Sequence, residues 1–155
     1  MNVPDPGHYF AYGSNMNPAR VAERGIDYGE VRAAVLHGYG LRFEKRSRDR
    51  DGAGHANVVW APSERVEGVL FTLSRPGEVG KMDRFELAPV NYSREVVVVA
   101  TGDGPMAAWT YFANAAVLAP GLSPPRWYLD HLLAGREFLS SEYFERLESI
   151  ECAGE

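Results

Sequence analysis

The stretch Tyr9-Phe10-Ala11-Tyr12-Gly13-Ser14-Asn15 decides how this chain begins to fold. Its first four residues are aromatic or apolar, which is typical of a short buried β-strand, and the strand then breaks abruptly. Gly13 permits backbone angles that are closed to other residues, and Ser14 and Asn15 favour local turns over strand continuation. A junction of this kind can direct consecutive backbone N–H groups at one point and so bind a small anion. From the triplet alone, an ordinary turn is the alternative.

A second informative stretch is the helix predicted over Pro76–Glu86, which begins with a proline at its first turn, where the missing N–H costs nothing. On this helix Val79, Met82 and Glu86 fall at positions i, i+3 and i+7, so the carboxylate shares a face with apolar side chains. A carboxylate placed among apolar neighbours is a candidate acid/base group. The alternative is that Glu86 is simply the solvated last residue of the helix.

Three effects are expected to raise the pKa of the Glu86 carboxyl group. Burial against the core disfavours the charged form, and the negative end of the helix dipole acts in the same direction. Asp83, three residues earlier, is expected to add like-charge repulsion. A raised pKa is what a carboxylate needs in order to take a proton from an ammonium group and later return it.

Strand-like segments dominate the first two thirds of the chain and helices lie between and after them. The predicted strands are Tyr9–Tyr12, Val31–Phe43 with a bulge or bend at Gly38 and Gly40, Ala56–Ala61 ending at Pro62, Val66–Leu73, Glu95–Thr101 and Met106–Ala113. The run Val96–Val99 is expected to be buried on both faces. The other predicted helices are Pro18–Glu23, Trp127–Ala134 between a Ser123 cap signal and Gly135, and one that starts near Ser140. The pattern predicts an α+β fold: a small, closed or nearly closed mixed β-barrel with peripheral helices.

Composition limits the function classes that fit. The 155 residues are expected to form a single domain, 1–155, and the net charge of −5 argues against nucleic acid or an anionic membrane as a partner. The basic run Arg42–Arg50 is interrupted by acidic residues and is interpreted as a solvated hairpin tip. No apolar run approaches the roughly 20 residues that span a bilayer, and no secretory signal is visible. With Cys152 as the sole cysteine, a cytoplasmic protein is expected.

Other common catalytic patterns are missing from the sequence. The four histidines, His8, His37, His55 and His131, have no metal-ligand spacing, so neither a metal site nor a metal cofactor is expected. No nucleophile elbow, dinucleotide fingerprint or P-loop follows any predicted strand. The residues therefore indicate chemistry performed by side chains and backbone groups alone.

The sequence resembles the γ-glutamylcyclotransferase-like family in three features. They are the YFAYGSN string, the Met-Asp-x-x-Glu segment that ends at Glu86, and Tyr92 a few residues later. The resemblance extends through most of the chain, and the N-terminal motif is the more specific part. It implies Glu86 as the catalytic residue. The implied substrate-binding residues are Tyr9, Phe10, Ala11, Tyr12, Gly13, Ser14, Asn15, Tyr92 and Tyr128, of which Tyr128 has the weakest support.

The resemblance implies cyclisation of a small-molecule γ-glutamyl amide to 5-oxoproline, with release of an amino acid or amine and with no cofactor. One departure concerns the residue after the base, because family members usually carry glycine where this chain has Leu87. The substrate therefore stays open: a γ-glutamylamine or a γ-glutamyl-capped biosynthetic intermediate is an alternative. A non-catalytic binding module of the same fold is a second alternative. The sequence does not indicate the oligomeric state.

Overall fold

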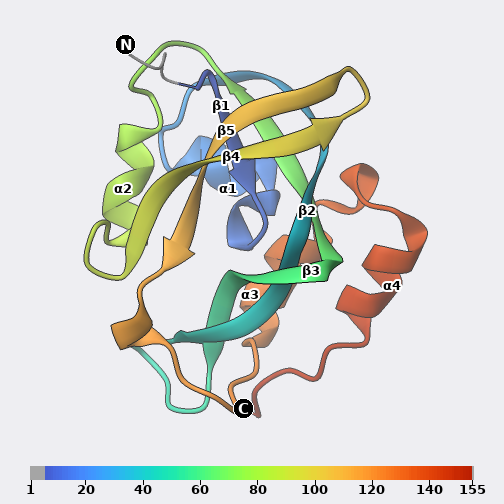
Figure 1. The fold of residues 1–155 in the computed structure, drawn as a ribbon. Coiled ribbons are helices and arrows are strands. Elements are labelled where there is room, and N and C mark those ends of the chain that lie inside the picture. Colours follow the sequence, from blue (N-terminus) through green and yellow to red (C-terminus); the bar gives the residue numbers. More distant parts are fainter. Residues whose placement is uncertain (1–5, 155) are drawn as a thin grey trace.

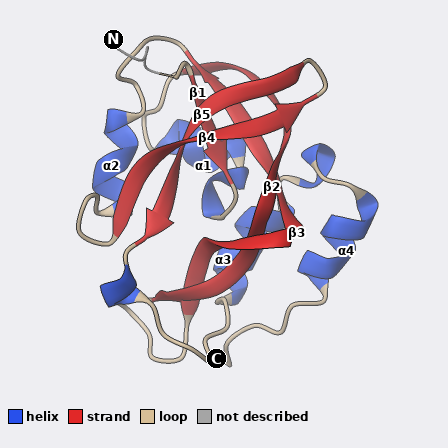
Figure 2. Cartoon of the chain, in the orientation of Figure 1, coloured by secondary structure: helices blue, strands red, loops and turns tan. Residues whose placement is uncertain are grey.

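A computed structural model describes residues 6–154 of the chain, in which five strands close into a mixed β-barrel (Figures 1 and 2). The strands are β1 (His8–Ala11), β2 (Tyr28–Arg46), β3 (Gly54–Leu73), β4 (Tyr92–Thr101) and β5 (Gly104–Ala113). Their order around the barrel is β1-β3-β2-β4-β5, and a parallel pairing of β1 with β5 closes it. The other neighbouring strands are antiparallel. The α+β barrel expected from the sequence is confirmed.

Short helices surround this barrel. They are η1 (Ser14–Met16), α1 (Pro18–Glu23), α2 (Gly80–Glu86), η2 (Ala115–Val117), α3 (Arg126–Leu133), η3 (Arg136–Phe138) and α4 (Ser141–Glu148). Figure 1 shows α2 and α4 on opposite sides of the barrel, with α3 below its centre. Among residues 6–154, none of these helices has the length and apolar character that crossing a membrane would require.

The long strand β3 corrects the prediction of two strands separated at Pro62. Its 20 residues run from Gly54 to Leu73. Its register against β2 shifts between the pairs His37–Arg65 and Tyr39–Trp60, which leaves the segment around Pro62 outside the ladder. A proline that lacks an N–H is tolerated at such a bulge. The bulge expected at Gly38 is confirmed by the same shift, and Gly38 has a positive φ of 84°.

The expectation that Val96–Val99 is buried on both faces is wrong. Val97 and Val99 lie in the core, whereas Val96 and Val98 are 46% and 63% exposed. Successive side chains of a strand point to opposite faces, and no helix of residues 6–154 covers the outer face of β4 at Val96 and Val98. The apolar run therefore predicts the strand correctly, but it does not show that both faces of the strand are buried.

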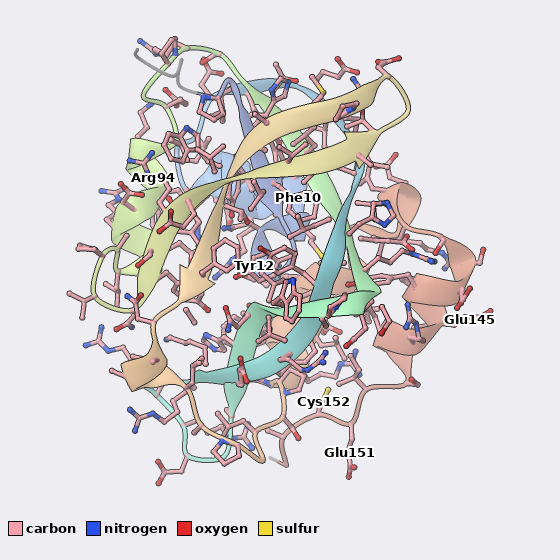
Figure 3. All side chains as sticks on the ribbon, in the orientation of Figure 1. Phe10, Tyr12, Arg94, Glu145, Glu151 and Cys152 are labelled. Atoms are coloured by element: carbon pink, nitrogen blue, oxygen red, sulfur yellow. The ribbon has the colours of Figure 1, made fainter. Side chains whose placement is uncertain are left out.

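The barrel interior is filled by side chains from every strand, and the N-terminal strand contributes Phe10 at its centre (Figure 3). Phe10, Leu70 and Val99 are completely buried. Burying one such side chain stabilises the fold by about 1.5–3 kcal/mol. This packing fixes β1, and with it the turn that follows.

Helix boundaries agree with the sequence except at three ends. The helix α2 begins at Gly80 because residues 76–79 form turns, although it ends at Glu86 as expected. For α3 the N-cap is Pro125 rather than Ser123, and the helix ends at Leu133, before Gly135. Predicted helix ends carry an error of a few residues, because propensities change gradually along the chain.

Candidate active site

The turn after β1 forms one wall of a cavity of about 180 Å³ at one end of the barrel. The other walls come from the end of α2, the β2–β3 hairpin, the start of β4 and the first turn of α3. The residues that line it include Tyr9, Tyr12, Gly13, Ser14, Asn15, Arg20, Arg24, Lys45, Ala56, Glu86, Tyr92 and Tyr128. Segments far apart in the sequence therefore meet at one place.

A second, more open depression of about 520 Å³ lies between the hairpin and α4. Two of its arginines are paired with acidic neighbours, in the bidentate contact of Arg42 with Glu64 and the contact of Arg65 with Glu67. The cavity beside Glu86 is smaller and contains two cations, Arg20 and Lys45, that form no ion pair with an acidic side chain among residues 6–154. For acid/base chemistry it is the better candidate.

Gly13 is required by space as well as by backbone angles. Its φ of −115° and ψ of −137° lie outside the main helical and extended regions, so the unusual conformation expected from the sequence is confirmed. A Cβ atom at this position would stand 2.7 Å from the Tyr128 hydroxyl and 3.2 Å from the Ala56 Cβ. The backbone of the turn can approach these two groups only because the residue has no side chain.

The turn that lines the cavity has backbone N–H groups without carbonyl partners. Among residues 6–154, the N–H groups of Gly13, Ser14 and Asn15 donate to no backbone carbonyl, whereas the carbonyl groups of Gly13 and Ser14 accept from Met16 and Asn17. The Ser14 N–H also interacts with the Tyr128 hydroxyl and opposes the burial that raises the pKa of that group. N–H groups that are free of backbone carbonyls and border a cavity suit a carboxylate.

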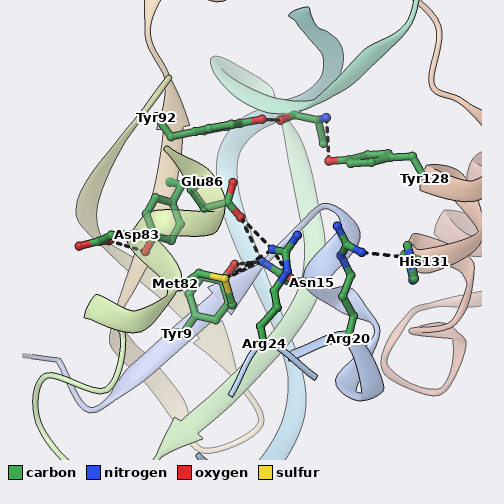
Figure 4. A network of polar contacts seen from close by, with 12 residues as sticks. Tyr9, Asn15, Arg20, Arg24, Met82, Asp83, Glu86, Tyr92, Tyr128 and His131 are labelled. Carbon is green, nitrogen blue, oxygen red and sulfur yellow. Dashed lines mark hydrogen bonds and ion pairs between the residues drawn. The ribbon is translucent and has the colours of Figure 1, made fainter. Parts of the chain in front are cut away.

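Glu86 lies at the C-terminal end of α2 and points towards this turn (Figure 4). Its Oε1 atom accepts a hydrogen bond of 3.1 Å from the Asn15 amide and lies 3.7 Å from Arg24 Nη1. Burial raises the pKa of the Glu86 carboxyl group, while Arg24, Arg20 and the Asn15 hydrogen bond oppose the rise. The net direction is upward, as expected from the sequence, and it favours proton exchange.

The Asn15 side chain connects several residues that line the cavity. Its Nδ2 donates to the Tyr9 hydroxyl at 2.9 Å as well as to Glu86, and contacts the Met82 sulfur at 3.4 Å. Its Oδ1 accepts from Arg24 at 3.1 Å. One amide side chain therefore fixes the position of the carboxylate relative to the turn.

Asp83 does not repel Glu86, which corrects that expectation. Its carboxylate faces the opposite side of α2, where it accepts hydrogen bonds from Tyr111 at 2.6 Å and from Arg94 at 2.9 Å. It is not among the causes of the Glu86 pKa shift. Since Tyr111 and Arg94 belong to β5 and β4, Asp83 ties the helix that carries Glu86 to the barrel.

Tyr92 and Tyr128 hold the same backbone unit from two sides. The Tyr92 hydroxyl donates to the Ala56 carbonyl, and the Tyr128 hydroxyl accepts from the Ala56 N–H, both at 2.9 Å (Figure 4). Each hydroxyl lies at the cavity wall, and the Tyr128 proton stays free to donate. The structure thus brings both predicted tyrosines to the cavity and gives each of them a structural partner as well.

Two of the residues implied by the resemblance do not reach the cavity. Phe10 and Ala11 are buried in the core and are not part of the cavity lining. Phe10 alternates with Tyr9 along β1 and points to the other face. The remaining implied residues, Tyr9, Tyr12, Gly13, Ser14, Asn15, Glu86, Tyr92 and Tyr128, all line it.

Sequence reasoning missed the cationic side chains of the site. Arg20 and Arg24 enter the cavity from α1 and the residue after it, and their i, i+4 spacing on a helix that follows the turn is a signal that was present. The hairpin expected over Arg42–Arg50 is confirmed, but its interpretation as a solvated tip is wrong for Lys45. This residue is only 5% exposed and faces the cavity.

No set of three or more His, Cys, Asp or Glu side chains within the described part of the chain is arranged to hold a metal ion. The groups that the cavity does contain are a carboxylate with a raised pKa, turn N–H groups without carbonyl partners, tyrosine hydroxyls and cations. Such a set can bind an anionic substrate and move protons.

Comparisons with known proteins identify relatives of this chain. Its residues 9–129 match the family described as gamma-glutamyl cyclotransferase, AIG2-like. The Bacillus subtilis protein YkqA, provisionally named a gamma-glutamylcyclotransferase, is 29% identical over 148 residues, which is 93% of this chain. The chain spans about half (52%) of the length of that relative.

Solved structures have the same fold. A structure named gamma-glutamyl cyclotransferase superimposes with a TM-score of 0.80 at 26% identity and covers 94% of this chain and 88% of its own. An uncharacterized human protein gives a TM-score of 0.82 at 25% identity, covering 97% and 90%. The crystal structure of YkqA gives 0.79 at 26% identity, covering 97% of this chain and 57% of its own.

Proposed function

Because the chain belongs to the gamma-glutamyl cyclotransferase, AIG2-like family, we propose that it is an enzyme that cyclises a γ-glutamyl amide to 5-oxoproline and releases an amino acid or amine. One observation carries this proposal: Glu86, with its raised pKa, lies in a cavity beside a turn whose backbone N–H groups donate to no backbone carbonyl among residues 6–154. The substrate of such a reaction has both an α-carboxylate for the turn and an α-ammonium for the base.

In this reaction the Gly13–Asn15 turn binds the α-carboxylate of the substrate. Glu86 takes a proton from the α-ammonium, and the freed amine attacks the γ-carbonyl carbon. The new C–N bond closes the ring, and the bond from the γ-carbon to the leaving nitrogen breaks. Two protons leave the α-nitrogen and both end on the leaving nitrogen, with Glu86 carrying them in turn.

The enzyme's contribution is orientation and proton transfer. The nucleophile is tethered to its target, so holding the reactive rotamer is worth several kcal/mol. Acid/base transfer by Glu86 adds about 10²–10⁴-fold. Asn15 supports both steps because it connects the turn to the carboxylate. The Tyr128 hydroxyl, whose proton is free, is placed to donate to the bound carboxylate.

The test is to incubate the purified protein with γ-glutamyl amino acids and γ-glutamylamines and to measure 5-oxoproline. Glu86→Gln keeps the shape of the side chain but cannot carry a proton, so its kcat should fall at least ~10²-fold. Glu95→Gln, the same change at an exposed position of β4, is the matched control and should retain full turnover.

Two results would contradict the proposal. Near-normal turnover in a folded Glu86→Gln variant would exclude Glu86 as the base. Substrate binding without any 5-oxoproline would identify a binding module that retains the fold. The cytoplasmic location expected from the sequence stays a prediction.

A further inference from the structure

The cavity contains more positive charge than the reaction described above uses. Arg20, Arg24 and Lys45 all line it, against the single carboxylate of Glu86 inside it. The other charged lining residues, Arg48 and Asp49, are exposed at its rim. With Glu86 ionised, the interior therefore has an excess of two positive charges.

The pKa values of neighbouring groups are consistent with this excess of positive charge. Burial and then the cations of Lys45 and Arg20 lower the pKa of His55 to about 4. Burial and then Arg24 lower the pKa of Arg20, and burial lowers that of Lys45. Each of these groups is destabilised as a cation at its position, so an anion bound among them would be favoured.

Lys45 has the fewest polar contacts of the three cations, although the charge of Glu86 opposes the burial that lowers its pKa. Arg24 has Glu86 as an ion-pair partner at 3.7 Å, and Arg20 contacts His131 at 3.5 Å. Lys45 is 95% buried, and no side chain among residues 6–154 gives it an ion pair or a hydrogen bond; its ammonium lies 5.9 Å from the centre of the Tyr92 ring. A buried ammonium that faces a cavity without a partner indicates that the partner comes from the ligand.

On the premise of the proposed function, we propose that Lys45 is a specificity-determining residue that binds a carboxylate on the leaving group, so that the enzyme prefers γ-glutamyl amino acids to γ-glutamylamines. A zwitterionic γ-glutamyl unit has no net charge and leaves the excess of two positive charges unchanged. A carboxylate on the leaving side removes one of them.

Lys45 and the residues proposed to bind the α-carboxylate belong to different elements. The turn residues Ser14 and Asn15 are buried at the floor, beside Glu86. Lys45 belongs to the hairpin, three residues before the exposed Arg48 at the rim. A substrate with its α-end at Glu86 extends its leaving group towards that rim.

The experiment compares two substrates that differ only in charge: γ-glutamyl-alanine and γ-glutamyl-alaninamide. Lys45→Met keeps the length of the side chain and removes its charge. Arg46→Met is the matched control, because it removes a charge from the next residue, which is exposed and contacts the Ala116 carbonyl outside the cavity. The measurements are kcat/KM by 5-oxoproline release and Kd by calorimetry in the Glu86→Gln background.

The wild type is expected to prefer γ-glutamyl-alanine by at least ~10-fold in kcat/KM, as a charge-assisted hydrogen bond provides. Lys45→Met should remove most of this preference by slowing only the carboxylate substrate, and Lys45→Arg should restore part of it. Arg46→Met should keep the wild-type ratio. In the Glu86→Gln background, the Kd ratio of the two compounds should change in the same way.

Three outcomes would overturn the inference. They are a wild type with no preference, a preference that survives in Lys45→Met, and an equal loss on both substrates, which would place Lys45 at the α-carboxylate. Absence of 5-oxoproline from every compound would instead contradict the proposed function. The calorimetric ratio still decides the role of Lys45 in that case, because binding does not require turnover.

Discussion

Glu86 is under two opposing influences whose balance sets its chemistry. Burial raises the pKa of its carboxyl group, and the guanidinium of Arg24 together with the Asn15 amide opposes the rise. Both opposing groups contact the same oxygen, Oε1, and leave the other oxygen for a proton. The carboxylate is thus held in place while it remains basic enough to accept a proton from an ammonium group.

The raised pKa of Glu86 predicts how stability depends on pH. Its pKa in the folded protein lies above the value near 4.5 in the unfolded chain, so between these two values the folded protein binds more protons. Stability contributed by protonated Glu86 is therefore lost as the pH rises through that window. Glu86→Gln cannot ionise and escapes this loss.

The measurement is the difference in Tm between Glu86→Gln and the wild type from pH 4 to pH 8. It should increase with pH above about 4.5 and then level off. The Glu95→Gln control should show no such increase, since that side chain is exposed on β4. A difference that decreases with pH would mean that the pKa of Glu86 is lowered instead.

Gly13→Ala tests the close approach of the turn to α3. The added Cβ would stand 2.7 Å from the Tyr128 hydroxyl, so the ring must move and weaken its hydrogen bond with Ala56. Overpacking of this kind costs about 1–3 kcal/mol. We expect a lower urea midpoint, and Tyr128→Phe in the same chain should recover part of the loss because it deletes the oxygen.

Gly102→Ala is the control for this change, because a Cβ there meets nothing within 4 Å. It should leave the free energy of unfolding within about 0.5 kcal/mol of the wild-type value, so the urea midpoint should hardly change. Equal midpoints for Gly13→Ala and the wild type would show that the turn can move away from Tyr128.

At the scale of elements, local patterns predicted the strands and helices well. The aromatic strand before Gly13 and the helix ending at Glu86 depend on residues close in sequence, and both are present. Local patterns failed where distant residues decide. Pro62 ends no strand because the register between β2 and β3 shifts beside it, and Val98 is exposed because no helix of the described residues lies over that part of β4. Leu87 keeps a left-handed conformation, φ 51°, at the position where the resemblance leads one to expect glycine.

Asp83→Asn tests the attachment of α2 to the barrel. The Asp83 carboxylate accepts hydrogen bonds from Tyr111 and from Arg94, which also packs over the Trp109 ring at 4.3 Å. An amide cannot accept from both donors with equal strength, so the free energy of unfolding should fall by about 1–2 kcal/mol. The kcat should also fall, since Glu86 lies one turn further along the same helix.

The control is Asp103→Asn, which breaks the 2.7 Å contact with Arg32 at a turn where the Asp103 side chain is 80% exposed. An exposed pair contributes about 0–1 kcal/mol, so this variant should be nearly neutral. The two variants are compared by urea denaturation and kcat. Equal effects of the two substitutions would mean that Asp83 does not position the helix.

At the scale of the whole molecule, the site is a product of barrel closure. The sequence indicated Glu86 and the Gly13–Asn15 turn because each has a local signature. It did not indicate Lys45, because only the pairing of β2 with β3 and the closure of the barrel place that residue beside the cavity. The charge of the cavity is likewise a sum over elements distant in sequence, which no local pattern contains.

Modified substrates identify the nucleophile of the reaction. If the α-amine is the nucleophile, acetylating it removes the basic lone pair, so N-acetyl-γ-glutamyl-alanine should give neither ring closure nor released alanine. Converting the α-carboxylate to an amide should mainly raise KM, because the Gly13–Asn15 turn loses its charged partner. Both products are measured, 5-oxoproline and free alanine. Alanine released from the acetylated compound at the rate of its parent would show that water is the nucleophile, and the reaction would be hydrolysis.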